Sequence, residues 1–248
     1  MLEPSMLLAY LVIFVAFVVV FTREVIAPAS RAPCDKRWLR MAGAINLFQM
    51  CAAVAAGYYF HAWFEGHALF NLEGLMPAAI AGALVFCIAS LIAYWWHRAA
   101  HKSDLLWRVF HQLHHSPSRI EALTAFYLHP LDSIAATFIT CLVAYLLLGL
   151  SATAAAWALV YVSLFNLYIH SDTTSPRWLG YLIQRPEMHR VHHQLGHHAQ
   201  NYGLPIWDLI FGTWINPKAR VVECGFDSDR SERICDMLLS KDVHRAER

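Results

Sequence analysis

Five long stretches of the sequence carry no charged residue, and they constrain the fold more than any other feature. They cover residues 6–21, 41–60, 76–96, 133–150 and 152–169. Each is close to the ~20 residues that span a bilayer core as a helix, and a helix satisfies its own backbone hydrogen bonds there. Because 58% of the chain is hydrophobic and only 15% is charged, a soluble bundle would have too few amphipathic faces to cover these helices. We therefore expect an all-α integral membrane protein with about four to five transmembrane helices.

The first of these stretches has the length of a signal peptide, but its flanks differ from those of one. The residues before it read MLEPS, with an acidic residue and no basic one, and no clear small-residue cleavage site follows it. A signal peptide has a basic start and such a site. We expect the stretch to be retained as a transmembrane helix.

The basic residues are distributed unequally between the first two loops. Residues 22–40 contain Arg23, Arg31, Lys36, Arg37 and Arg40, whereas residues 61–75 contain no Lys or Arg. The positive-inside rule places the first loop in the cytoplasm and the second outside. Alternation then puts the N-terminus outside and everything after Trp96 and after Ile169 in the cytoplasm. The membrane would be the inner membrane of a bacterium or the endoplasmic reticulum of a eukaryote. The net charge of +1 gives no case for a nucleic-acid partner.

Twelve of the fifteen histidines lie between His97 and His198. They form the motifs HRAAH from His97, HQLHH from His111 and HRVHH from His189, with the others at His129, His170, His197 and His198. The first motif directly follows the third uncharged stretch, the second lies in the cytoplasmic segment after it, and the third lies in the last cytoplasmic segment. They therefore reach one membrane face. The charge argument did not use the histidines, so this agreement is independent.

The spacing within each motif suits shared metal ligation. Residues i, i+3 and i+4 lie on the same side of a helix, so each motif can aim two or three imidazoles at one point. Neutral imidazole is the commonest metal ligand among side chains. Eight or more converging nitrogens are more than one ion with about four to six ligands needs. We expect two metal ions held by a helical cap on the cytoplasmic side, and no catalytic residue beyond the ligands.

Imidazole binds iron, zinc, copper and nickel, so the ligand type leaves the metal open. The set is larger than a structural zinc site and lacks its thiolates. Lipid C–H bonds resist acid, base and nucleophile, and their oxidation calls for activated oxygen at a redox metal such as iron. We favour an oxygenase that acts on lipid. The alternative is a histidine-rich membrane metal transporter, or a metal-binding protein without oxygenase activity, although a transporter needs ionisable ligands near the bilayer midplane.

The three motifs, in this order, resemble the histidine boxes of the fatty acid hydroxylase superfamily, also called the sterol desaturase family. Their flanks are also similar to segments of that family: LWRVFHQLHHSP (106–117), YLHPLD (127–132) and NYGLPIWDLIFGTW (201–214). The likeness covers roughly residues 93–214. It implies a non-haem di-iron oxygenase that hydroxylates, or desaturates, a fatty acyl, sterol or related lipid with O2 and two electrons. Zinc can replace the two irons in preparations.

Carried over to this chain, the resemblance implies nine metal ligands: His97, His101, His111, His114, His115, His170, His189, His192 and His193. Six further residues are candidates for a ligand or for a contact with one: His129, His197, His198, Asn166, Asn201 and Asp208. Asn166 stands where some relatives have a histidine, four residues before His170, so that ligand is absent or replaced here. His129 is either a ligand or the cap of a segment that begins at Pro130.

Two pairs among these candidates have alternative roles. Asn201 and Asp208 either orient ligating imidazoles or serve as caps and turns. His197 and His198 lie in a connector that is often longer and acidic or polar in the family. They act as variable ligands, as proton shuttles or as residues behind the ligands, and we favour the last hypothesis.

The sequence contains no GxGxxG motif, no CxxCH motif and no cysteine cluster for iron–sulfur. We therefore expect a separate electron donor, a ferredoxin or a cytochrome with its reductase. The basic segments 98–102, 185–190 and 218–220 either attract an acidic carrier or follow from positive-inside charge, and we favour the second interpretation. The expected domains are residues 1–75 with N-terminal transmembrane helices and loops, 76–215 with the catalytic histidine boxes, and 216–248 as a cytoplasmic tail.

Overall fold

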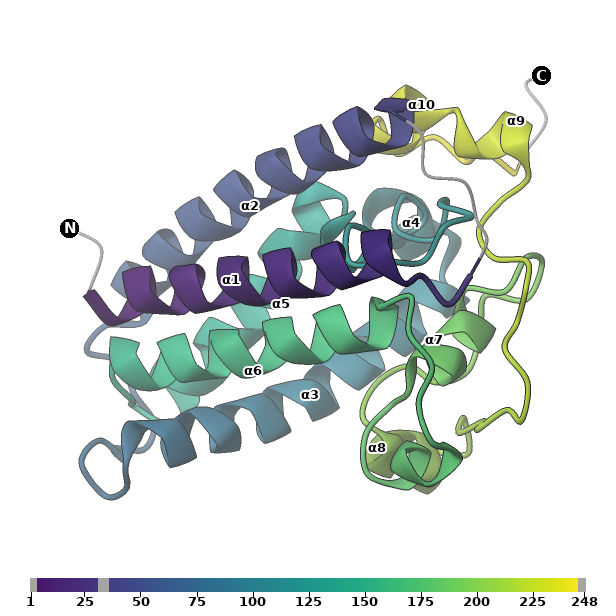
Figure 1. The fold of residues 1–248 in the computed structure, drawn as a ribbon. Coiled ribbons are helices and arrows are strands. Elements are labelled where there is room, and N and C mark those ends of the chain that lie inside the picture. Colours follow the sequence, from purple (N-terminus) through teal and green to yellow (C-terminus); the bar gives the residue numbers. More distant parts are fainter. Residues whose placement is uncertain (1–3, 31–35, 245–248) are drawn as a thin grey trace.

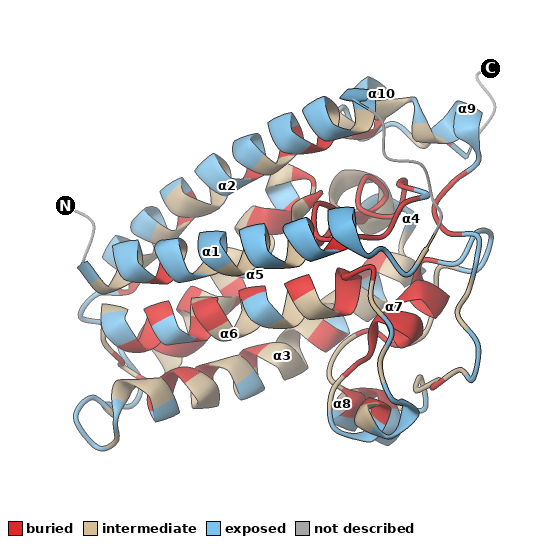
Figure 2. Cartoon of the chain, in the orientation of Figure 1, coloured by how far each residue is buried: buried red, intermediate tan, exposed pale blue. Residues whose placement is uncertain are grey.

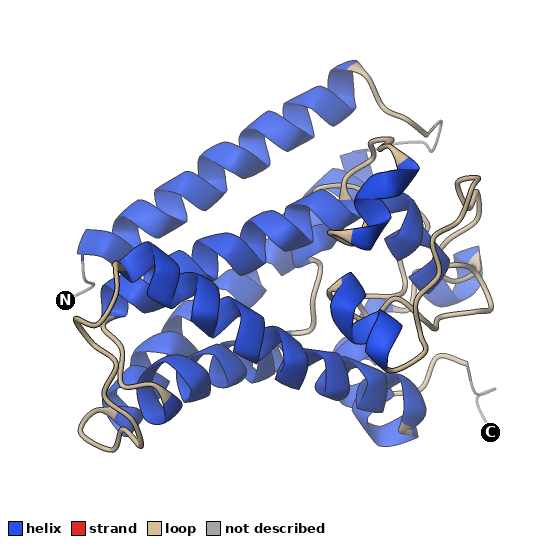
Figure 3. Ribbon diagram, turned by 90° about the horizontal axis from the view of Figure 1, so that it is seen from below, coloured by secondary structure: helices blue, strands red, loops and turns tan. Residues whose placement is uncertain are grey.

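The computed structural model describes residues 4–30 and 36–244, so Arg31 of the first basic loop lies outside the described residues. Figure 3 shows helices and loops, and no β-sheet forms within the described ranges. Within the described residues, five segments are long and apolar enough to cross a membrane: α1 (Pro4–Ile26), α2 (Lys36–Phe64), α3 (Ala78–Lys102), α5 (Pro130–Cys141) with its π-helical continuation η3 (Leu142–Leu147), and α6 (Ala152–His170). The prediction of an all-α integral membrane protein is confirmed.

Several of these helices extend beyond the uncharged stretches. α2 begins at Lys36, and α3 continues past Trp96 to Lys102. Long basic side chains reach from a helix end to polar surroundings, so they do not terminate the helix. The extension of α3 is important for the site because it places HRAAH on the last turns of the helix.

The five long helices alternate in direction along the bundle (Figure 1). α1, α3 and α6 run one way, whereas α2 and α5 run the other way. α3 packs against α6, α2 against α5, and α1 against α6. The loops 65–77 and 148–151 lie at one end, and residues 103–129 and 171–244 lie at the other. The histidine motifs therefore share one end of the bundle, as the charge pattern predicted; which end faces the cytoplasm stays a prediction.

Short helices build the cap at that end: α4 (Asp104–Leu106), η1 (Trp107–His111), η2 (Thr124–Phe126), η4 (Arg177–Tyr181), α7 (Pro186–His192), α8 (Pro205–Ile210), α9 (Ser228–Ser231) and α10 (Ile234–Leu238). Figure 2 shows buried residues concentrated in α7, in the cap end of α6 and in the segment between α4 and α5, whereas α1 and α2 expose their outer faces. Leu113, Phe226 and Met237 share one buried cluster with Ala42 and Ile45 of α2. The segment after residue 215 thus packs on the cap and on α2.

Candidate metal centre

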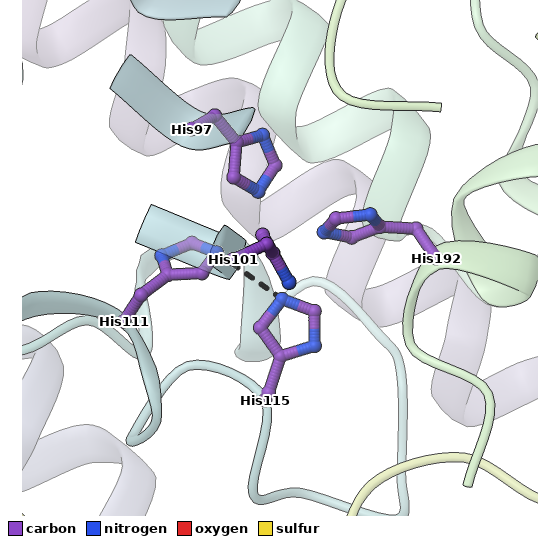
Figure 4. A group of neighbouring side chains, drawn as sticks. All are labelled: His97, His101, His111, His115 and His192. Carbon is purple, nitrogen blue, oxygen red and sulfur yellow. Dashed lines mark hydrogen bonds between the residues drawn. The ribbon is translucent and has the colours of Figure 1, made fainter. Parts of the chain in front are cut away.

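The structure brings all nine histidines of the predicted ligand set together in two groups. The first group contains His97, His101, His111, His115 and His192, and the second contains His114, His170, His189 and His193. Within each group one ring nitrogen per residue lies within 4.8 Å of all the others. Figure 4 shows the five rings of the first group arranged around a common centre. We call these the first and second imidazole groups.

Each HxxHH motif is divided between the two groups. His111 and His115 belong to the first group, and His114 belongs to the second. HRVHH reverses the assignment, with His189 and His193 in the second group and His192 in the first. Of the two or three imidazoles expected at one point, each HxxHH motif brings two together, those at i and i+4, and its i+3 imidazole belongs to the other group. At about 100° per residue, positions i and i+4 differ by about 40°, whereas i+3 and i+4 differ by about 100°.

The local backbone allows this division. α7 carries HRVHH through His192, with Pro186 at its first turn, where a missing N–H costs nothing. HQLHH does not continue a regular helix, because His111 ends the π-helical turn η1 and residues 112–115 form turns. The wide π turn and the turns after it are a deviation that helical spacing could not predict.

The nitrogens within each group face one another at distances suited to a shared ion. The Nε2 atoms of His111 and His115 are 3.1 Å apart. In the second group, Nε2 of His170 lies 3.2 Å from that of His114 and 2.9 Å from that of His189. With metal–nitrogen bonds of about 2.0–2.1 Å, neighbouring ligand atoms lie about 2.9 Å apart in an octahedron and about 3.3 Å apart in a tetrahedron. The observed separations fall in this range.

Three ring nitrogens of the first group are buried and have no hydrogen-bond partner. They are Nε2 of His97, His101 and His192. A buried polar atom without a partner is costly, and such atoms in a structure call for an explanation. A metal ion at the centre of the group would bind all three, so the donor set fits a metal.

Burial also keeps the imidazoles in the form that binds metal. In five of the rings outside the long helices, burial is the largest cause of a lowered pKa, and the charges of neighbouring imidazoles lower it further. These rings belong to His111, His115, His189, His192 and His193. The pKa of His114 falls to about 3, chiefly through burial. These rings are neutral at physiological pH, so each has a lone pair available.

Backbone carbonyls orient four of the rings through Nδ1. His97 Nδ1 donates to Tyr202 O and His192 Nδ1 to Gln200 O, both at 2.7 Å. His170 Nδ1 lies 2.8 Å from the carbonyl oxygen of Asn166, and His114 Nδ1 lies 3.3 Å from that of Tyr127. A carbonyl can only accept, so each contact places the hydrogen on Nδ1 and leaves the Nε2 lone pair toward the group.

A carboxylate and another histidine hold two further rings. His111 Nδ1 lies 2.9 Å from Asp132 Oδ2, and both side chains are buried. His115 Nδ1 lies 3.1 Å from Nδ1 of His198. Asp132 was missed as a site residue, although it is the acidic residue of YLHPLD and stands directly before an uncharged stretch. An acid in that position is the signal that could have identified it.

The connector after the third box has an unusual backbone. His198, Gln200 and Asn201 all have positive φ, between 42° and 67°. Non-glycine residues rarely adopt this region, and they cluster at functional sites. The turn brings the carbonyls of Gln200 and Tyr202 to the first imidazole group. The shortness of this connector in the sequence thus corresponds to a compact backbone turn.

The structure places all six additional candidates outside both groups. His129 caps α5, with Nδ1 accepting from Leu131 N at 3.2 Å and Nε2 donating to Leu238 O. His197 is exposed and contacts the Gln200 side chain, so the position behind the ligands that we favoured was wrong for this residue. His198 lies behind His115, as we favoured, and Asn166 offers its backbone carbonyl to His170.

Asn201 and Asp208 support the site indirectly, because the hydrogen bonds of their side chains go to other groups than imidazoles. Asn201 Nδ2 donates to the carbonyl oxygens of Met188, in α7, and Ile215. The Asp208 carboxylate accepts from the backbone N–H of Tyr202 and Gly203, and burial raises its pKa to about 6. Because the carbonyl of Tyr202 holds His97, Asp208 acts on the first group through one peptide unit.

Two of the three basic segments are engaged inside the cap. Arg185 donates to Asn216 Oδ1 and to Ser175 O, and Arg190 donates to the carbonyl oxygens of Val221 and Val222. Arg220 pairs with the buried Asp172. These guanidinium groups hold the cap together, which argues against a role in attracting a carrier, whereas the interpretation by positive-inside charge stays a prediction.

Known proteins resemble this chain over the same region. The model of the fatty acid hydroxylase family matches residues 82–213, which is more than half of the chain. An ornithine lipid hydroxylase of Rhizobium tropici is 31% identical over 194 residues, covering 73% of this chain and 55% of that protein. Alkylglycerol monooxygenase of Homo sapiens is 31% identical over 171 residues, covering 66% of this chain and 36% of that protein.

A very-long-chain aldehyde decarbonylase of Oryza sativa subsp. indica is 29% identical over 152 residues, covering 56% of this chain and 57% of that protein. The chain thus spans about half of these relatives' length, or less in the case of the human protein. No solved structure matches the chain. The family match covers the three histidine boxes and the helices that carry them, and the chain therefore belongs to the fatty acid hydroxylase family.

Proposed function

We propose that the protein is an O2-dependent membrane oxygenase that hydroxylates, or desaturates, a C–H bond of a lipid. The observation that carries this proposal is the pair of neutral imidazole groups at one end of a membrane bundle. Family membership supports it, as do two relatives that by name are an ornithine lipid hydroxylase and an alkylglycerol monooxygenase. The substrate would be a fatty acyl lipid, a sterol or a related lipid.

We propose two iron ions as the cofactor, one in each imidazole group. Five and four nitrogen donors suit two separate ions, and imidazole is a ligand of iron in O2-dependent enzymes. Bound iron would supply O2 activation and electron transfer, which side chains cannot perform alone. Zinc binds the same donors, so it can replace iron in preparations.

The chain's own residues would orient the ligands and exclude water. Asp132 and the backbone carbonyls hold the rings in one tautomer, so the ligand lone pairs need no rearrangement. The Tyr202 ring covers the first imidazole group, with its centroid 5.4–5.5 Å from those of His97, His101 and His192. Such cover protects an oxidising centre from side reactions with water.

Electrons would come from a separate donor, a ferredoxin or a cytochrome with its reductase. An open pocket of about 300 Å³ adjoins the first imidazole group. His101, Trp107, His198 and His244 are among its lining residues. The ring centroid of Trp107 lies 5.2 Å from those of His101 and His115. We propose that a soluble carrier docks at this pocket and that the surface around it is cytoplasmic.

The alternative is a metal transporter. Transporters bind their ions near the bilayer midplane, often at broken helices. Both imidazole groups lie at the cap end of the bundle, and α3 reaches them as a continuous helix. Their position favours the oxygenase.

The test begins with metal analysis of protein purified after expression with ample iron. We expect about two irons per chain, one for each imidazole group. The double variant His114→Ala, His193→Ala should lose the ion of the second group, and His101→Ala, His115→Ala should lose that of the first. His67→Ala, in the loop at the far end, is the control and should retain both.

The second step supplies O2 carrying a heavy oxygen isotope, a reductant and a panel of lipids to the iron-loaded protein. Hydroxylation places the label in the lipid, and either double variant should abolish it. A protein without metal, or with one zinc that survives both double variants, would contradict the proposal.

A further inference from the structure

Two short helices of the cap, η4 and α8, expose a cluster of large apolar side chains. They are Trp178, Tyr181 and Leu182 at η4, with Ile206, Leu209 and Ile210 on α8. The two helices are in contact, and Trp214, shortly after α8, donates to the Gly180 carbonyl at 3.1 Å and lies with its ring centroid 5.1 Å from that of Tyr181. We call this the η4–α8 surface. Large exposed apolar surfaces mark sites of interaction with proteins, ligands or membranes.

α8 presents its apolar face outward. Ile206, Leu209 and Ile210 have the i, i+3, i+4 spacing of one helix face, and all three are exposed. Asp208, the acidic residue of the helix, points inward and binds Tyr202 N, Gly203 N and Thr213 Oγ1. A helix at a water-covered surface has the opposite arrangement, with its apolar face toward the core. The orientation of α8 therefore requires apolar surroundings outside the protein.

α8 lies beside the membrane-spanning part of α3. Trp207 Nε1 donates to Ser90 Oγ at 2.8 Å, and the Phe211 ring lies 4.8 Å from that of Trp95. Ser90 is six residues inside the uncharged stretch that ends at Trp96, which is about 9 Å at about 1.5 Å per residue. Interfacial helices bury their apolar face by about 5–10 Å. The anchoring of α8 reaches this depth.

The residues around α8 are those typical of the membrane interface. Trp95 is exposed on α3, and the Arg98 guanidinium lies 5.4 Å from its ring centre while donating to the Phe211 carbonyl. Arg177 and Lys218 are exposed on the flanking segments. Tryptophan, tyrosine and basic side chains concentrate where hydrocarbon gives way to headgroups. The contact of the Phe211 ring with the exposed Trp95 joins this surface to α3.

We propose that η4 and α8 are embedded in the membrane interface, so that the η4–α8 surface is covered by phospholipid glycerol and acyl groups. The bundle would then hold not only five spanning helices but also one interfacial element on its cap. A single loop, from Tyr202 to Leu204, connects this element to the first imidazole group. The placement concerns the membrane alone and does not depend on the metal or on the reaction.

Photocrosslinking in phospholipid nanodiscs tests the proposal. The photoreactive residue p-benzoylphenylalanine is introduced, one position at a time, at Leu182 and Leu209, which are 72% and 49% exposed. Val19 on the outer face of α1 is the positive control, and Val222, an 85% exposed apolar residue elsewhere on the cap, is the matched negative control. All four positions are partly or largely solvent-accessible in the protein, so the replacement leaves the core unchanged.

After irradiation, mass spectrometry of the intact chain measures the phospholipid adduct. We expect adducts at Leu182 and Leu209 in a yield similar to that at Val19 and several-fold above that at Val222. Yields at both positions equal to that at Val222 would overturn the proposal. Crosslinks from these positions to a second copy of the chain, in place of lipid, would overturn it in favour of a protein interface.

Discussion

Single residues behind the ligands determine how firmly each ion would be held. Asp132 is the clearest of them, because its carboxylate contacts Nδ1 of His111 while Nε2 of the same ring faces the first imidazole group. A carboxylate in this position fixes the tautomer and increases the basicity of the ligand nitrogen, and its loss typically costs about 10–100-fold in metal affinity. His198 occupies the equivalent position behind His115.

Replacing Asp132 by Asn should therefore weaken the first group selectively. We expect the metal affinity of that group to fall about tenfold, because the negative charge is lost while the shape is kept. The second group should retain its ion, since its contacts to Asn166 and Tyr127 are unchanged. Metal content after a graded chelator challenge measures the change. Asp229→Asn, on an exposed part of the cap, is the control, and equal retention by both variants would contradict the assigned role.

The lowered histidine pKa values predict that acid destabilises the metal-free protein. The pKa is about 3 for His114 and is lowered for His189 and His193. These three rings therefore bind protons less readily in the folded protein than in the unfolded chain. The unfolded chain, with an ordinary histidine pKa of about 6.5, then takes up more protons as the pH falls. Stability is thus present above about pH 6.5 and is lost progressively from there toward about pH 3.

Thermal unfolding of chelator-treated protein in detergent at about pH 7 and about pH 5 measures this loss. The midpoint should be lower at the acidic pH. A variant with Gln in place of His114, His189 and His193 should show a smaller decrease. An identical midpoint for the unaltered protein at both pH values would mean that the buried rings do not control its stability.

At the scale of elements, the helix pair α3 and α6 positions ligands from both imidazole groups. α3 carries His97 and His101, and α6 ends at His170. The pair is closely packed at Gly82, where a Cβ atom would lie 2.5 Å from Trp157 Cβ and 2.8 Å from the Ala154 carbonyl oxygen. Small residues allow such close approach of helices in a membrane.

Gly82→Ala should destabilise the bundle by about 1–3 kcal/mol, because the added methyl group meets backbone atoms that cannot rotate away. The thermal midpoint in detergent should fall, and chelator should remove metal more readily. Gly43→Ala in α2 is the matched control. Apart from the adjacent backbone of its own helix, no atom lies within 4 Å of its Cβ position, and alanine favours a helix over glycine. Similar midpoints for the two variants would contradict close α3–α6 packing.

At the scale of the whole molecule, the part of the chain that the structure describes has an odd number of candidate spans, which separates the start of α1 from the cap. The five candidate spans and their alternating directions place α1's start and the cap at opposite ends of the bundle. The basic residues of the first loop predict that the cap end faces the cytoplasm.

Epitope tags at the two ends of the chain test this orientation by protease protection in sealed cytoplasmic-side-in vesicles. The N-terminal tag should be cleaved and the C-terminal tag should be protected until detergent is added. Cleavage of both tags, or of neither, would show that the number of spans is even. The reverse pattern would place the imidazole groups outside.

The sequence alone predicted about four to five spans and the eight histidines of the three motifs, and the resemblance to the family added His170. Hydropathy over about 20 residues and the spacing of neighbouring side chains on a helix are local properties, so they can be recognised without tertiary contacts. The domain boundaries at residues 75 and 215 stay a prediction. Buried contacts between Phe226, Met237 and α2 connect the segment after residue 215 to the N-terminal helices.

Only the tertiary structure decided how the nine imidazoles divide and what holds them. His114 joins His170 and His189, whereas its neighbour His115 joins His101 and His192. Asp132 and the carbonyls of Gln200 and Tyr202 became visible as partners through contacts between segments up to 105 residues apart. Apolar length and helical phase are properties of a short segment, and therefore of the sequence itself. The closure of two metal-binding groups depends on how five helices and a cap pack together, which the order of residues alone does not reveal.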